Sequence, residues 1–399
     1  MICYLTFRSA NSSIASITSP QRSSLETPDI LQYLLSNTPI EPPSPAGNGT
    51  PHVIPNRDIT FSSFLPTILA QEKSHFSSVF SLGHALFDPL DLHLDKSTPT
   101  DIRHRVLALQ RADALSTWVA QTVAPSVGSD LDANSSNFAK DAFLYLSGNQ
   151  IAKAVGVLTN GGGVRLATLI SQVPGDAEFR SAISDQLRIW KEEKVDLHIS
   201  EDVRKLYALA AGEVNFLEGS GRREDINMVK GLDWLRVFGM LLWFSSPLDT
   251  PLHESFERYE ELFKSTSGRV PAPTPWYLKP GQRVSPAIHD GLFNLIKLAL
   301  SPSMTLESAL DPLGFTPNPT DYKLSWFIYI ILSRCLRLRD FTDRQLHDAM
   351  LDDSDSGQSV DGFSATANNL TMNFALQLQQ EGLVQEAAFV LLFLEDDIG

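Results

Sequence analysis

Three long apolar stretches constrain this chain most, because each has the pattern of a helix that other helices enclose. None of the three contains a plausible catalytic group. The stretches are GNQIAKAVGVLTNGGGVRLATLISQ (148–172), GLDWLRVFGMLLWF (231–244) and DYKLSWFIYIIL (321–332). A helix that is apolar on every side is buried by its neighbours. The second and third stretches therefore predict central helices of a large helical protein, which is most simply explained as a scaffold.

Helical spacing of apolar residues continues over most of the chain. One predicted helix face contains Val106, Leu109, Ala112, Leu115 and Val119. Two helix–glycine–helix patterns, around Gly161–Gly163 and around Gly382, are typical of stacked αα-hairpins. The predicted fold class is all-α, an irregular α-helical solenoid over residues 63–399, without a regular repeat length.

Residues 1–62 have a different composition, rich in Ser, Pro, Thr and Asn. Such a segment cannot bury enough apolar surface to offset its chain entropy, so we expect most of it to be disordered. Ile30–Leu35 is predicted to form one or two helical turns, and HVIPNRDITF (52–61) to be extended. Two further stretches, Ser265–Pro286 and Leu351–Gly362, are predicted to be surface loops.

The charge of the chain excludes several classes of partner. The 32 Lys and Arg residues stand against 47 Asp and Glu residues, a formal net charge of −15. No basic cluster is present, so direct binding of nucleic acid is not expected. No apolar run approaches the roughly 20 residues of a membrane span, so membrane insertion is not expected either. The two cysteines, Cys3 and Cys335, indicate a reducing compartment.

Candidate chemical motifs fit structural roles better than catalytic ones. Gly161–Gly163 follows a helical segment, so a helix–helix turn is favoured over a phosphate loop. An acidic run at Asp352, Asp353 and Asp355 has Ser364 where a calcium loop needs Glu, which favours a solvated loop. Cys335 lies in an apolar stretch typical of a buried thiol. The triplet at His75–Ser77 matches a self-cleavage signature, but a helical pattern precedes it. We therefore predict no enzyme activity, no cofactor and no metal.

Taken in order, eight stretches resemble the nucleoporin 96 family, called nucleoporin 145C in fungi. They are VIPNRDITF (53–61), FSLGHALFDP (80–89), RADALSTWV (111–119), the hairpin at 148–172, RKLYALAAG (204–212), GLDWLRVFGMLLWF, DYKLSWFIYIIL and EGLVQEAAFVLLFLEDD (381–397). The resemblance implies an ancestral coatomer element, a solenoid folded back into a U with a crown, a trunk and a tail. It also implies a place in the Y-shaped scaffold of the nuclear pore, at the nuclear envelope, in support of mRNA and protein transport.

The family resemblance further implies two kinds of contact. A segment before the helices adds strands to a small β-propeller shared with the COPII coat; the positions that match it are Val53, Ile54, Ile59 and Phe61. The crown packs against a second helical nucleoporin of the long arm of the Y; the positions that fall in the crown are Trp234, Phe238, Leu241 and Trp243. We expect some of these four to be core residues and a subset to reach the partner.

The chain begins late in the propeller segment and stops at Gly399, where the family pattern continues into a tail. We therefore expect crown contacts to be intact, propeller binding to be weakened and tail contacts to be missing. A COPII-type outer-coat scaffold, which shares the fold and the propeller, is the alternative within scaffolds. A helical adaptor or enzyme-like domain is the alternative from another class, since fold does not determine function.

Overall fold

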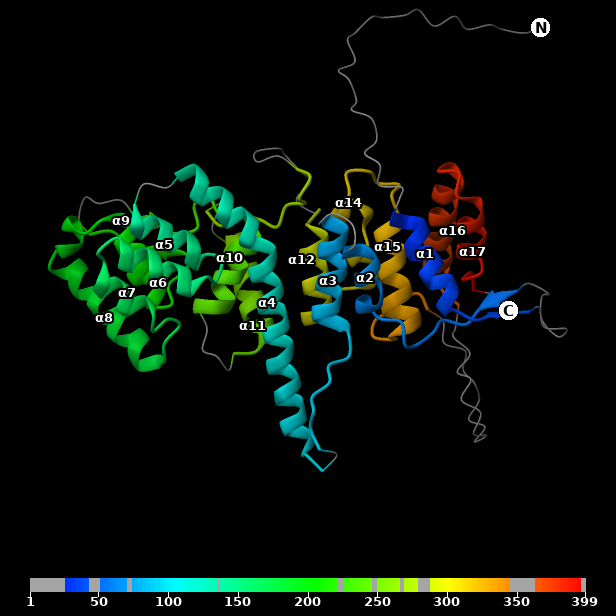
Figure 1. Ribbon diagram of the computed structural model, residues 1–399, viewed down its shortest axis with the longest axis horizontal. Helices are drawn as coiled ribbons and strands as arrows, with labels where there is room; N and C mark the ends of the chain where they lie inside the picture. Colours follow the sequence, from blue (N-terminus) through cyan, green and yellow to red (C-terminus); the bar gives the residue numbers. More distant parts are fainter. Residues whose placement is uncertain are drawn as a thin grey trace, which may run out of the picture.

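The computed structural model describes residues 26–42, 51–69, 74–95, 97–134, 137–220, 225–245, 250–265, 269–278, 288–344 and 363–395. Helices dominate these residues, and they are arranged in two limbs joined by a bend (Figure 1). The outgoing limb contains α1 (Glu26–Asn37), β1 (Ile40–Glu41), β2 (His52–Val53), α2 (Phe61–Leu69), α3 (His75–Phe87) and α4 (Thr100–Asn134).

The bend follows the outgoing limb and contains short helices. It comprises α5 (Phe138–Leu146), α6 (Ile151–Asn160), α7 (Val164–Ile170), α8 (Ala177–Glu192), the 3₁₀ turn η1 (Val195–His198) and α9 (Glu201–Ala210). A two-stranded ribbon, β3 (Phe216–Leu217) and β4 (Ile226–Asn227), then leads into the return limb.

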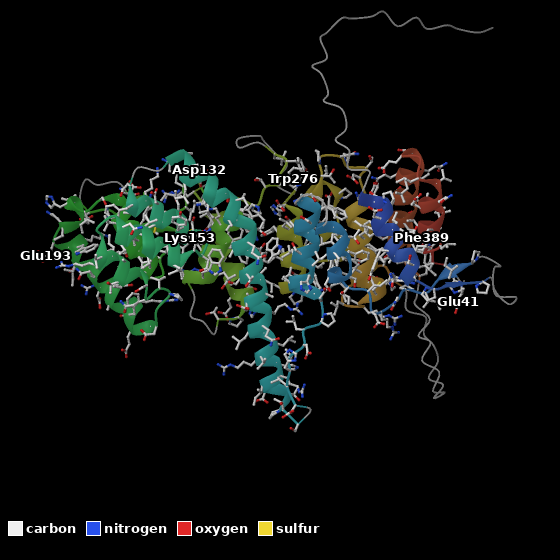
Figure 2. The ribbon with its side chains drawn as sticks, in the orientation of Figure 1. Glu41, Asp132, Lys153, Glu193, Trp276 and Phe389 are labelled. Carbon is white, nitrogen blue, oxygen red and sulfur yellow. The ribbon has the colours of Figure 1, made fainter. Side chains whose placement is uncertain are left out.

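The return limb runs back beside the outgoing one. It contains α10 (Trp234–Met240), the π-helix η2 (Leu241–Ser245), α11 (Leu252–Ser265), α12 (Gly291–Leu300), α13 (Leu306–Ala309), α14 (Pro312–Phe315), α15 (Lys323–Tyr329), the π-helix η3 (Ile330–Cys335), α16 (Ala365–Gln380) and α17 (Val384–Leu391). Between the limbs, α4 contacts α10, α3 contacts α12, and α1 contacts α17. Figure 2 shows Glu193 at the bend and Phe389 near the other end. The predicted U-shaped, all-α solenoid is confirmed.

Aromatic side chains join the two limbs. The rings of Phe64 and Phe80 on the outgoing limb lie 6.2 and 6.3 Å from the ring of Phe327 on the return limb. All three side chains are fully buried. Because large aromatic rings contribute most to burial per residue, this cluster binds the limbs into one core.

The two helices predicted to be central are central. Every residue of α10 is buried, and so is every residue from Leu324 to Tyr329 in α15. Both helices change to π spacing in their second half, at Leu241 and at Ile330. The predicted hairpins are also confirmed, since Gly162 and Gly382 adopt positive φ in the turns between α6 and α7 and between α16 and α17.

Helix α4 departs from its predicted face. Leu115 and Val119 are buried, but Leu109 is 43% exposed, and Ile102 and Leu107 are exposed as well. The reason is length: 35 residues span about 52 Å at 1.5 Å per residue. The first half of α4 therefore extends beyond the body of the molecule, as Figure 1 shows.

The N-terminal part contributes more to the helical body than its composition predicts. Helix α1 has three turns rather than one or two, and it buries Ile30, Leu31 and Leu34 against α2 and α17. The segment expected to be extended has a strand only at His52–Val53, and α2 already begins at Phe61.

Of the predicted loop Ser265–Pro286, residues 269–278 are held against the return limb. The Tyr259 hydroxyl donates to the carbonyl of Pro271 over 2.8 Å, and the Tyr277 hydroxyl donates to that of Leu313 over 2.6 Å. These contacts make the described part a packed segment rather than a free loop. The predicted loop Leu351–Gly362, with Asp352, Asp353 and Asp355, lies outside the described residues.

Candidate functional site

Three of the four residues assigned to propeller insertion lie in the core of this chain. Val53, Ile59 and Phe61 are buried, whereas Ile54 is 42% exposed. The Phe61 ring packs 5.9 Å from that of Phe80, and its amide donates to Asp88 over 2.9 Å. Insertion into a propeller stays a prediction, and in this structure only Ile54 among the four offers an exposed side chain.

The backbone around Val53 forms a small ribbon at the end of the molecule. Ile40 pairs with Val53 and Glu41 with His52, antiparallel. The Val53 amide also donates to the carbonyl of Leu392 over 3.2 Å, which fastens the ribbon to α17. Within the described residues β1 pairs with β2 alone, so the other edge of β1 has no strand partner there.

The four crown residues are likewise buried, on α10 and η2. They are Trp234, Phe238, Leu241 and Trp243. The Trp234 ring packs 6.0 Å from that of Phe293 on α12, and the Trp243 indole donates to Ser116 Oγ on α4 over 2.9 Å. These residues hold α10 and η2 between the limbs. Of the two roles expected for them, the structure shows the core role.

A buried arginine on α10 completes this junction. Arg236 is 1% exposed, and its guanidinium donates to Ser147 Oγ at the end of α5 and to Asp130 on α4. A buried charge needs such a partner. Sequence reasoning placed Arg236 in an apolar helix without finding its partners, because Asp130 and Ser147 are 106 and 89 residues away.

Apolar and charged side chains meet at one surface of the bend. A groove of about 420 Å³ lies between α8, α9 and β3, with Leu187, Trp190, Phe216 and Leu217 among its lining residues. Lys191 and Glu218 form an ion pair at its rim. The lining also includes the buried ion pair of Asp196 and Arg204, so charged side chains lie inside the groove as well as at its rim. Elsewhere on the bend, Ile189 of α8 and Leu197 of η1 are exposed.

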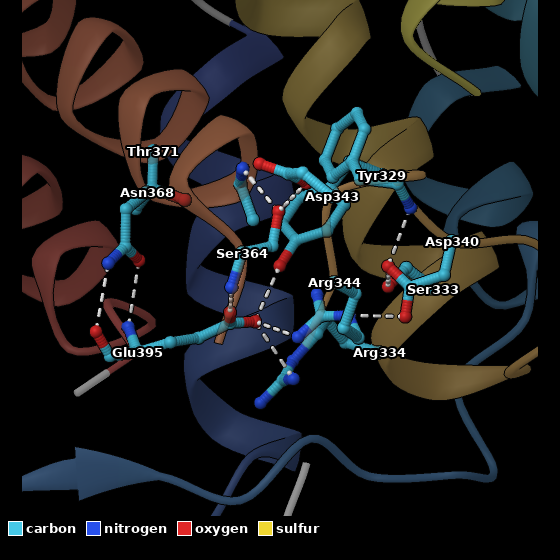
Figure 3. A network of polar contacts seen from close by, with 12 residues as sticks. Tyr329, Ser333, Arg334, Asp340, Asp343, Arg344, Ser364, Asn368, Thr371 and Glu395 are labelled. Carbon is cyan, nitrogen blue, oxygen red and sulfur yellow. Dashed lines mark hydrogen bonds and ion pairs between the residues drawn. The ribbon is translucent and has the colours of Figure 1, made fainter. Parts of the chain in front are cut away.

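At the opposite end, a buried carboxylate gathers residues from three segments (Figure 3). Glu395, which follows α17, accepts from Arg334 over 3.0 Å and from Arg344 over 2.8 Å. It also accepts from the Tyr329 hydroxyl over 3.2 Å and from the Ser364 amide over 2.9 Å. The carboxylate thereby joins the α16–α17 hairpin to α15 and η3; we call these contacts the Glu395 network.

The charges in this network are mutually stabilised. Burial lowers the pKa of Arg344, but hydrogen bonding to Asp340 and the charge of Glu395 raise it above its ordinary value. Burial and then the charge of Glu395 raise the pKa of Tyr329. For Asp343, burial acts to raise the pKa, but hydrogen bonds from Ser364 and Thr366 lower it overall. The arrangement is that of a structural clamp, with all partners supplied by the chain.

The remaining chemical candidates have structural surroundings. Burial raises the pKa of the Cys335 thiol to about 12, although Arg334 acts to lower it, so the reactive thiolate is disfavoured. Gly161–Gly163 is the turn between α6 and α7, as predicted. His75 begins α3, where Ser74 and Ser77 form a capping box. Within the described residues, no group of His, Cys, Asp and Glu side chains could hold a metal ion.

Comparison with known proteins agrees with the resemblance in the sequence. The family model described as "Nuclear protein 96" (Nup96) matches residues 140–399. Nucleoporin nup189 of Schizosaccharomyces pombe is 26% identical over 333 residues, 80% of this chain and 17% of that protein. Nuclear pore complex protein Nup98-Nup96 of Drosophila melanogaster is 26% identical over 341 residues, 84% of this chain and 16% of that protein.

A plant relative shows the same likeness. Nuclear pore complex protein NUP96 of Arabidopsis thaliana is 28% identical over 308 residues, 75% of this chain and 26% of that protein. The chain thus spans about a quarter or less of the length of these relatives. None of the described helices is long and apolar enough to cross a bilayer. Since the family model covers well over half of its residues, the chain belongs to the nucleoporin 96 family, as its ordered motifs predicted.

Proposed function

We propose that this chain is a structural scaffold subunit of the Y-shaped subcomplex of the nuclear pore, and that it supports mRNA and protein transport through pore assembly. Its family membership and the pore proteins among its relatives support this role. The U-shaped solenoid supports it too, because a helical stack closed by a continuous core is a rigid structural part. The proposed role needs neither catalysis nor a cofactor.

The observation that carries the proposal furthest is the surface at the bend. The predicted crown residues Trp234 and Phe238 are buried, so a crown partner has to use other side chains. The groove lined by Leu187, Trp190 and Phe216 supplies apolar and aromatic contacts. Aromatic side chains in partly enclosed pockets are typical interface hot spots. We assign the contact with the helical nucleoporin of the long arm to this groove.

The β1–β2 ribbon is the proposed contact for the small β-propeller shared with the COPII coat. Strand addition uses main-chain hydrogen bonds, and the outer edge of β1 offers them within the described residues. Ile40 and Ile54 provide exposed apolar side chains at this ribbon. Because β1 and β2 have only two residues each, we expect this contact to be weak.

Location in the cell tests the proposed function. The fluorescently tagged chain should gather at the nuclear rim. The double variant Trp190→Asp and Phe216→Asp, at two lining residues of the groove, should spread away from the rim, whereas Leu338→Asp, at an exposed apolar position outside the groove, should stay there. A folded wild-type chain that shows no enrichment at the rim would contradict the pore assignment.

A further inference from the structure

The last hairpin, α16–α17, has an apolar outer face. Four large apolar side chains on it are between 42 and 63% exposed: Met372, Leu376, Val384 and Leu391. The inner face is packed, since the Phe374 ring lies 5.0 Å from that of Trp326 on α15 and the Phe393 ring lies 5.4 Å from it. The hairpin therefore has two apolar faces, of which α15 covers one.

The four exposed side chains form one continuous strip. Met372 and Leu376 are four residues apart on α16, and Val384 and Leu391 are seven apart on α17, so each pair shares a helix face. The turn at Gly382 sets the helices antiparallel. Met372 and Leu391 are ten and nine residues from that glycine, so they lie level with each other. We call this strip, with Ala388 between Val384 and Leu391, the outer strip.

Charge is almost absent from the hairpin that carries the outer strip. Helix α16 contains no Asp, Glu, Lys or Arg, and the only charged residues from Ala365 to Leu394 are Glu381 and Glu386. The polar residues near the strip are amides, such as Asn369, Asn373 and Gln380. Charge depletion around apolar and Met side chains distinguishes the core of a protein interface from ordinary surface.

We propose that the outer strip is a self-association surface on which a second copy of this chain docks. A chain of net charge −15 repels its own copy over most of its surface. At the outer strip two copies meet without facing like charges. The strip is also self-complementary, because a two-fold axis places Met372 and Leu376 of one hairpin against Val384 and Leu391 of the other.

The strip is short, and this limits its strength. Helix α17 has eight residues, about 12 Å, so the contact is smaller than the roughly 1,200–2,000 Å² of a stable interface. We expect a weak dimer, with a dissociation constant on the order of 100 μM. Salt should tighten it, because added ions screen the net repulsion between copies and leave the apolar contact unaffected.

Sedimentation equilibrium of the whole chain at about 5 to 300 μM, in low and high NaCl, tests the proposal. The expected result is a monomer–dimer equilibrium whose dissociation constant falls at least about twofold with salt. Leu376→Glu and, separately, Val384→Glu should weaken it at least about tenfold, because each places two carboxylates at the symmetric contact. Ile102→Glu, at an exposed apolar site on α4, is the matched control and should dimerise like the wild type.

Circular dichroism of each variant confirms that it is folded before the comparison is made. A wild-type chain that stays monomeric at both salt concentrations would overturn the proposal. So would a dimer that persists in both strip variants, since another surface would then hold it. A dimer that loosens as salt is added would also count against it, because that behaviour belongs to an ionic contact.

Discussion

At the scale of single residues, the close approach of α2 and α3 depends on one missing side chain. A Cβ at Gly83 on α3 would lie 2.3 Å from the ring of Phe61, whereas one at Gly156 on α6 would meet nothing within 4 Å. Gly83→Ala should cost about 1–3 kcal/mol of unfolding free energy through overpacking. Gly156→Ala should instead stabilise by about 0.5–1 kcal/mol, because alanine favours a helix. Denaturant titration measures both, and equal effects would refute the close contact.

Asp290 gives a pH dependence of known sign. Burial raises its pKa from 3.8 to about 7, although hydrogen bonds from Leu292 and Trp234 act to lower it. Between about pH 4 and 7, Asp290 is therefore protonated in the folded state and ionised in the unfolded state. Its contribution to stability is complete below pH 4 and is lost as the pH rises to 7.

Replacing Asp290 by a neutral residue should remove this loss of stability at rising pH. Asp290→Asn keeps an N-cap oxygen for the Leu292 amide and carries no charge to bury. Above pH 7 its free energy of unfolding should exceed that of the wild type by a few kcal/mol, at about 1.4 kcal/mol per pKa unit. Asp176→Asn, at the exposed N-cap of α8, is the control and should lack this gain. A variant less stable than wild type at pH 8 would show that Asp290 is ionised without cost.

At the scale of elements, the Glu395 network predicts how firmly the last hairpin is attached. Glu395→Ala leaves the largely buried side chains of Arg334 and Arg344 without their shared carboxylate. Losing one partner of a buried ion pair typically costs about 3–5 kcal/mol. Glu192→Ala, which removes a partner of the exposed Arg188, should cost less than about 1 kcal/mol.

Hydrogen exchange locates the effect of the Glu395 substitution. Amides of α16 and α17 should exchange much faster in Glu395→Ala, while those of α5 and α6 at the bend should change little, because local openings follow local contacts. Unchanged protection in α16 and α17 would mean that the aromatic contacts with Trp326 hold the hairpin without the network.

Local patterns predicted the elements, but long-range contacts decided which side chains remain free. The apolar helices at 231–244 and 321–332 were predictable because a helix without a polar face has to be enclosed. The exposure of Leu109 was not, since the end of the core along α4 depends on where α3 and α10 pack against it. The partners of Arg236 and Glu395 lie tens of residues away or more, where no spacing rule applies. For the same reason, the sequence indicated which segments contain Val53 and Trp234, but not whether their side chains are buried or exposed.

At the scale of the whole molecule, the two limbs should unfold together. Phe327 contacts Phe64 and Phe80 across the limbs, and Phe327→Ala should cost about 3–5 kcal/mol by leaving a cavity in this shared core. Hydrogen exchange should rise in α2 and α3 as well as in α15, since both limbs line that cavity. Faster exchange confined to α15 would show that the limbs are independent units.

As proposed above, this U-shaped chain would act as a scaffold subunit of the nuclear pore by binding the other long-arm helical nucleoporin of the Y-complex at its bend. Light scattering on the purified chain mixed with that nucleoporin tests it most directly. We expect a stable one-to-one mass that Trp190→Asp with Phe216→Asp abolishes and Leu338→Asp preserves. Two separate masses from well-folded proteins would contradict it.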